Sequence, residues 1–80
     1  MATRKVTLTY PEQLIREPLL FRMVKQFDVM PNIRRARVTD SVAEMVVELE
    51  GDETALEGGV NYLREQGVQV APVEGDIVGA

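Results

Sequence analysis

The chain has 80 residues and a net charge of −4, with 45% hydrophobic and 28% charged residues, a balance typical of one folded, water-soluble domain. Cysteine and histidine are both absent, which excludes disulfides, thiolate and imidazole metal ligands, and Cys or His nucleophiles. The acidic balance disfavours nucleic acid as a partner, and because the sequence has no apolar run of roughly 18 residues, we expect no membrane insertion and a cytoplasmic location.

The first predicted elements are a strand over residues 4–10 and a helix over residues 18–28. In the strand, apolar and polar residues alternate, which gives it one face for the core and one for water. The core face carries Val6, Leu8 and Tyr10. Pro18 suits the first turn of the helix, because proline lacks the N–H that a first turn leaves unpaired. The helix has a single apolar stripe, formed by Leu19, Leu20, Met23, Val24 and Phe27.

A β-hairpin is predicted next, with strands over residues 31–38 and 43–50 joined by a loop of four residues. The loop length sets the pairing of the two strands. On the inner face we expect the pairs Val38–Ala43, Ala36–Met45 and Arg34–Val47. On the outer face we expect an ion pair between Arg37 and Glu44, which helps to fix the register.

The second predicted helix starts at Asp52-Glu53-Thr54, because carboxylates stabilise the positive N-terminal end of a helix. Its buried stripe consists of Ala55, Leu56, Gly59, Val60 and Leu63. We expect Gly59 to permit close contact with the sheet, because a glycine inside a helix otherwise costs about 1 kcal/mol. Gly67 ends the helix. A last strand is predicted over residues 68–73 at an edge of the sheet, because Pro72 cannot donate to a central ladder.

The element order βαββαβ indicates a ferredoxin-like α+β fold, which is a four-stranded antiparallel sheet in the order 4-1-3-2 with two helices on one face. We therefore expect one domain over residues 1–73 and a mobile tail over residues 74–80. The open face of the sheet is expected to be mainly polar. It carries Lys5, Thr7, Thr9, Arg37, Glu44, Val46, Glu48 and Gln69.

The sequence contains no grouping of residues that is typical of catalysis. The acidic residues between Glu44 and Glu53 fit strand solvation and helix N-terminal charge better than a cation site, and Ser41 has no histidine to activate it. The run Arg34-Arg35-Ala36-Arg37 could attract phosphate, and it is also typical of an edge strand that resists aggregation. We therefore predict that the protein is not an enzyme and has no catalytic residue, metal site or cofactor.

The candidate ligand-binding residues lie at the start of the second strand. Asn32 can donate and accept hydrogen bonds, as an α-amino carboxylate ligand requires. Met30 is a flexible apolar residue that suits an adaptable pocket. The alternative is that Asn32 is an ordinary asparagine at the entry to a strand.

Several segments together resemble the NIL domain, the C-terminal regulatory module of the ATPase subunit of bacterial methionine importers. They are Pro18-Leu19-Leu20, Phe27-Asp28-Val29, Asn32-Ile33, Val46-Val47-Glu48-Leu49-Glu50-Gly51 and Tyr62-Leu63-Arg64-Glu65-Gln66-Gly67-Val68. The resemblance covers roughly residues 5–73. It implies a ferredoxin-like fold similar to ACT domains, a homodimer and methionine binding. In this chain it implies that Asn32 contacts the ligand, with Ile33 and Met30 as apolar neighbours.

The chain departs from the family pattern at two positions. The signature Asn-Ile-Leu reads Asn32-Ile33-Arg34, and a glycine common early in the third strand is Ala43. Both departures concern the methionine pocket rather than the fold. We expect a stand-alone sensor, without an ATPase domain, that binds methionine or a related sulfur amino acid as a homodimer. The alternative is an adaptor that docks on a transporter ATPase, a ferredoxin or an enzyme of sulfur metabolism.

Overall fold

The computed structural model describes residues 1–73, so the tail predicted at residues 74–80 lies outside the described residues. The elements in chain order are β1 (Ala2–Tyr10), η1 (Glu12–Leu14), α1 (Leu19–Phe27), β2 (Met30–Val38), β3 (Ala43–Gly51), α2 (Glu53–Gln66) and β4 (Gln69–Pro72). The predicted βαββαβ order is confirmed. The short 3₁₀ turn η1, which the sequence pattern did not predict, lies between β1 and α1.

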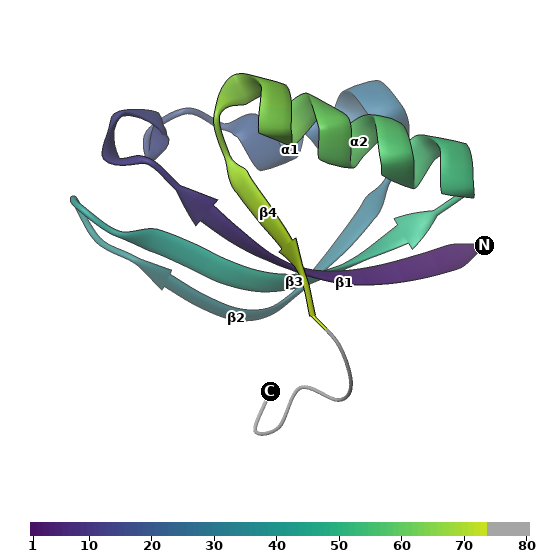
Figure 1. Cartoon of the computed structure of the whole chain (residues 1–80), viewed down its shortest axis with the longest axis horizontal. Helices are drawn as coiled ribbons and strands as arrows, with labels where there is room; N and C mark the ends of the chain where they lie inside the picture. The colour runs from purple at the N-terminus through teal and green to yellow at the C-terminus, as the bar shows by residue number, and fades with distance from the viewer. Residues whose placement is uncertain (74–80) are drawn as a thin grey trace.

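The strands form one antiparallel sheet in the order β2-β3-β1-β4, which confirms the predicted order and the edge position of β4. Both helices lie on one side of this sheet (Figure 1). The core lies between the two layers, because the apolar residues of alternating strands and the apolar stripes of both helices meet there. The largest fully buried side chains are those of Leu8, Leu19, Met23, Val29, Val47, Leu49, Leu56 and Leu63.

The register of the β2–β3 hairpin follows the prediction near the loop and departs from it further along. The confirmed pairs are Val38–Ala43, Arg37–Glu44 and Ala36–Met45. The described residues include no ion pair between Arg37 and Glu44. The predicted pairing of Arg34 with Val47 is wrong, because Ile33 takes that position and Arg34 is the extra residue of a β-bulge. The bulge thus places Ile33, rather than Arg34, opposite the buried Val47.

Each helix is followed by a residue with a left-handed backbone. Asp28 follows α1 with a φ of 56°, and Gly67 follows α2 with a φ of 107°. The prediction that Gly67 ends the second helix is confirmed. The first helix was predicted over residues 18–28 and is one residue shorter at each end. The Val68 N–H donates to the Leu63 carbonyl at 3.0 Å and closes the end of α2, so β4 begins one residue later than predicted.

The glycines of α2 let this helix approach α1 rather than the sheet, which corrects the prediction for Gly59. A Cβ at Gly59 would lie 2.8 Å from Sδ of Met23, and a Cβ at Gly58 would lie 2.9 Å from Cδ1 of Phe27. Both contacted residues belong to α1. The helices therefore pack at a separation that a side chain at either glycine would increase.

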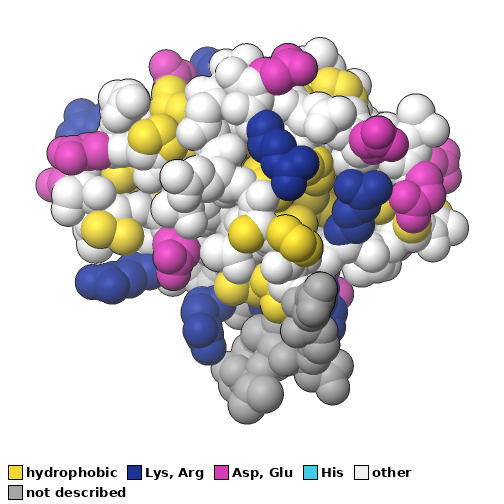
Figure 2. Space-filling view, in the orientation of Figure 1, with side chains coloured by type: hydrophobic (Ala, Val, Ile, Leu, Met, Phe, Trp, Pro, Cys, Tyr) yellow, Lys and Arg dark blue, Asp and Glu magenta, His cyan; other side chains and the backbone are white. Residues whose placement is uncertain are grey.

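The helices leave the β2 side of the sheet uncovered. Ile33 and Val38 on β2 are 52% and 58% exposed, and Phe21 on α1 is 61% exposed. Phe21 and Val38 line one cavity, and the three residues together are called here the α1–β2 strip. On the face shown in Figure 2, hydrophobic side chains also lie between basic and acidic ones.

Candidate functional site

Asn32 and Met30 lie on the open face of the sheet, near the start of β2. This strand forms one edge of the sheet, and residues directly opposite each other in an antiparallel pair share a face. Asn32 lies opposite Glu48 and Met30 lies opposite Glu50. Because Val47 and Leu49 are buried under the helices, their neighbours on β3 point the other way, and so do Asn32 and Met30.

A hollow of about 270 Å³ lies beside these two residues. It is lined by Thr3, Met30, Pro31, Asn32, Glu48 and Glu50. The Met30 side chain is 63% exposed, so the hollow is a surface feature and not an enclosed cavity. Its lining combines an amide, two carboxylates and a thioether, which suits a small polar ligand with an apolar part.

Ile33 does not line this hollow. Its partner across the sheet is Val47, which is buried against the helices, so Ile33 lies on the helix side of β2. The structure therefore brings Asn32 and Met30 together and places Ile33 on the opposite face. The assignment of all three residues to one ligand site remains a prediction.

A basic and an acidic side chain flank Asn32. The Nε atom of Arg34 lies 3.7 Å from Oε1 of Glu48, and the two side chains are 37% and 26% exposed. Because Glu48 lies on the open face, this contact places the Arg34 guanidinium there too, although strict alternation predicted that Arg34 would face away from Arg35 and Arg37. The bulge thus adds a guanidinium to the surroundings of Asn32.

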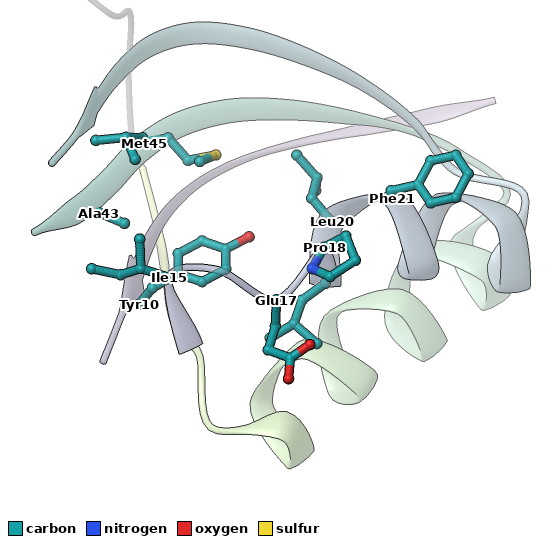
Figure 3. Close-up of a pocket in the computed structure, with 10 residues that line it drawn as sticks. Tyr10, Ile15, Glu17, Pro18, Leu20, Phe21, Ala43 and Met45 are labelled. Atoms are coloured by element: carbon teal, nitrogen blue, oxygen red, sulfur yellow. The ribbon is translucent and has the colours of Figure 1, made fainter. Parts of the chain in front are cut away.

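A second cavity, of about 180 Å³, lies at the other end of the sheet (Figure 3). It lies between the chain that joins β1 to α1 and the loop end of the β2–β3 hairpin. Tyr10 forms part of its wall. Burial raises the pKa of the Tyr10 phenol above its usual value of 10.0, because the phenolate is poorly solvated there.

Sequence reasoning missed Glu48 and Arg34 as neighbours of Asn32, and it missed the cavity at Tyr10. The predicted hairpin register places Leu49 opposite Asn32. The bulge shifts the pairing to Glu48, and the alternation carries no signal of that shift. Tyr10 gave one signal, because it places a hydroxyl at the end of an apolar strand face, and a buried tyrosine hydroxyl usually has a hydrogen-bond partner.

Within residues 1–73, no cluster of three or more acidic side chains is arranged to hold a metal ion. No helix in the same range is long and apolar enough to cross a membrane.

Comparison with solved structures shows the fold. The C-terminal domain of an ABC transporter ATP-binding protein from Enterococcus faecalis superimposes with a TM-score of 0.78 over 91% of this chain and 86% of that chain, at 17% sequence identity. A de novo designed protein with ferredoxin fold superimposes with a TM-score of 0.54 over 100% of this chain and 91% of that chain, at 10% identity. The predicted ferredoxin-like fold is therefore confirmed.

Comparison with curated sequences shows the family. The chain is 36% identical over 59 residues to methionine import ATP-binding protein MetN 2 of Acinetobacter baylyi, covering 69% of this chain and 17% of the relative. It is 35% identical over 74 residues to methionine import ATP-binding protein MetN of Streptococcus pneumoniae, covering 88% of this chain and 21% of the relative. The chain thus matches about a fifth of the length of these relatives. Because the NIL domain family model matches residues 4–72, the chain belongs to the NIL domain family.

Proposed function

We propose that this domain is a regulatory sensor that binds methionine or a related sulfur amino acid as a homodimer, with Asn32 at the ligand. The observation that carries the proposal is membership of the NIL family, whose curated members with similarity to this chain are named for methionine import. The chain covers only a part of those relatives, so the proposal concerns sensing by this domain and includes no catalytic activity.

The lining of the hollow at Asn32 supports an amino-acid ligand. The carboxylates of Glu48 and Glu50 attract an α-ammonium group, while the Asn32 amide donates to an α-carboxylate. The Arg34 guanidinium, beside Glu48, offers a second donor for the same carboxylate. The Met30 side chain provides an apolar contact for a thioether chain.

The open position of the hollow supports a dimer. β2 is an edge strand, so its outer backbone N–H and C=O groups are available to a strand of a second copy. A second copy paired there would extend the sheet beside the hollow, so that its residues complete the wall of the ligand site next to Asn32. A ligand that binds the completed site better than the incomplete one shifts the equilibrium towards the dimer.

Sedimentation velocity with and without L-methionine tests this proposal. The monomer has a mass of 8.9 kDa, so dimer formation doubles the sedimenting mass. We expect methionine to raise the dimer fraction of the wild type and of Asn61→Ala, a matched change on the exposed side of α2. Asn32→Ala is expected to show the same proportions of monomer and dimer with and without methionine. A distribution of the wild type that methionine leaves unchanged contradicts the proposal.

A second candidate function, an adaptor for a protein partner, is favoured by the exposed α1–β2 strip. Large exposed apolar groups gathered in one place often mark an interaction surface, and Phe21 at 61% exposure is the largest of the three. The partner classes are a transporter ATPase, a ferredoxin and an enzyme of sulfur metabolism. Calorimetric titration of purified proteins of these classes is the test. Binding that Phe21→Ser abolishes supports an adaptor, and lack of binding to any class rules it out.

A further inference from the structure

The cavity at Tyr10 is separate from the hollow at Asn32. Tyr10 pairs with Ala43 at the loop end of β3, whereas Asn32 pairs with Glu48 near its other end. The two sites also lie on opposite faces of the sheet, since Tyr10 belongs to the buried face and Asn32 to the open one. Residues 11–18, which link β1 to α1, cover the cavity at Tyr10 from the side of the helices.

The Tyr10 hydroxyl has no protein partner. The residue is only 8% exposed, and within residues 1–73 no hydrogen bond to its hydroxyl is present. In Figure 3 this hydroxyl points into the cavity, towards Pro18 and Leu20 at the start of α1. Within residues 1–73 no fully buried side-chain nitrogen or oxygen lacks a partner, so this hydroxyl is accessible from the cavity and available to a ligand there.

The first turn of α1 lines the same cavity and leaves two donors unused. The Leu19 N–H donates to the Glu17 carbonyl at 2.8 Å, and the Arg22 N–H donates to the Pro18 carbonyl at 3.0 Å. In the part of the chain that the structure describes, the amides of Leu20 and Phe21 have no acceptor, and Pro18 offers no side-chain cap. Unused amides and the helix dipole make the start of α1 attractive to an anion.

The rest of the cavity wall is apolar. It includes Ile15, Leu20, Phe21, Val38 and Met45. Glu17 also lines the cavity, but its Oε2 lies 3.3 Å from Nη2 of Arg22, and Figure 3 shows its carboxylate pointing away from Tyr10. The Tyr10 hydroxyl and the start of α1 therefore form a polar end, and the side chains named first form an apolar remainder.

The volume suits a small molecule. Liquid water takes about 30 Å³ per molecule, so a cavity of about 180 Å³ accommodates roughly six to eight non-hydrogen atoms. Drug-sized or nucleotide ligands usually occupy 300 Å³ or more, roughly twice that space.

We infer that this cavity binds a small organic carboxylate with a short aliphatic or thioether chain. The carboxylate accepts hydrogen bonds from the Tyr10 hydroxyl and from the amides of Leu20 and Phe21. The chain of the ligand packs against Ile15, Val38 and Met45. The inference goes beyond the proposed sensor site, because it needs neither Asn32 nor a second copy of the domain.

The test is a titration of the ¹⁵N-labelled protein followed by amide chemical shifts, with three probes. Hexanoate carries the carboxylate and the chain, L-methionine adds an α-ammonium group, and 1-hexanol keeps the chain without the charge. We expect saturable shifts at the Leu20 and Phe21 amides with hexanoate and none with 1-hexanol. L-methionine then shows whether the site takes amino acids or only plain carboxylic acids.

Three variants make the result specific. Tyr10→Phe removes only the hydroxyl and is expected to weaken hexanoate binding about tenfold or more, as loss of a hydrogen bond to a charged group does. Tyr62→Phe, at the other tyrosine, and Asn32→Ala are expected to bind hexanoate like the wild type. The absence of saturable shifts with hexanoate, or equal affinity in Tyr10→Phe, overturns the inference. If the amide shifts caused by L-methionine disappear in Asn32→Ala but persist in Tyr10→Phe, methionine binds at the proposed sensor site. That result would overturn the inference for amino acids.

Discussion

Tyr10 combines a buried ring with a hydroxyl that no described residue binds, and this has a measurable effect on stability at high pH. Burial raises its pKa in the folded state above 10.0, so the folded protein keeps a proton that the unfolded chain has lost. The resulting stabilisation is present in full below about pH 10 and is lost as the pH rises through the folded-state pKa.

Chemical denaturation from about pH 8 to about pH 11 should therefore show a steeper loss of stability for the wild type than for Tyr10→Phe. Near neutral pH the two proteins should agree within about 0.5 kcal/mol, because the removed hydroxyl has no partner to lose. Tyr62→Phe serves as the control, since it leaves Tyr10 in place. Parallel pH profiles of the wild type and Tyr10→Phe would contradict the raised pKa of Tyr10.

Gly59 shows how one missing side chain sets the distance between two helices. In Gly59→Ala the new Cβ would meet Sδ of the fully buried Met23 at 2.8 Å. We expect a net loss of about 1 kcal/mol in the free energy of unfolding, because overpacking costs more than the gain in helix propensity. In a Met23→Val background the same change should become neutral or stabilising. Urea denaturation of the wild type, the two single variants and the double variant measures these effects. Additive changes in the free energy of unfolding would argue against this contact.

At the level of elements, the end of α1 is strained at Asp28. A left-handed backbone, here with a φ of 56°, costs an ordinary L-residue energy that glycine avoids, and a negative charge is unfavourable at a helix C-terminus. Asp28→Gly is therefore expected to raise thermal stability, by up to about 1 kcal/mol. Asp28→Ala removes the charge and keeps the strain, so it should gain less. Equal effects of the two changes would mean that charge alone matters.

Much of the arrangement of elements could be predicted from the sequence, because alternation and helical periodicity report directly on burial. Val6, Leu8 and Tyr10 identified the buried face of β1, and the predicted hairpin loop gave the correct first pairs. The bulge could not be predicted. It inserts Arg34 without changing the residue types around it. Strict alternation therefore placed the residues of β2 that precede the bulge on the wrong face of the sheet.

The same bulge limited the prediction of the candidate site. Asn32 and Met30 were expected beside each other and lie on one face. Ile33 was expected beside them and lies on the helix side, because successive residues of a strand point to opposite faces. The bulge decides only which of the two faces each residue takes. The cavity at Tyr10 depends on how residues 11–18 fold back over the sheet. That arrangement is a matter of tertiary packing, which local patterns do not encode.

At the scale of the whole molecule, the sheet separates two hollows of different character. The hollow at Asn32 carries carboxylates and lies on a free sheet edge. The cavity at Tyr10 is mainly apolar and lies under the connection between β1 and α1. The proposed sensor uses the hollow at the free edge, where ligand binding and association with a second copy are linked without rearrangement of the core.

The measurement that tests the sensor proposal most directly is thermal unfolding of the purified domain against L-methionine and related sulfur amino acids. A ligand at 100 times its dissociation constant adds about 2.7 kcal/mol to stability, which raises the Tm of a domain of this size by about 10 °C or more. We predict such a shift for the wild type and Asn61→Ala, and its loss in Asn32→Ala. No shift with any of these amino acids, or an equal shift in Asn32→Ala, would contradict a sensor site at Asn32.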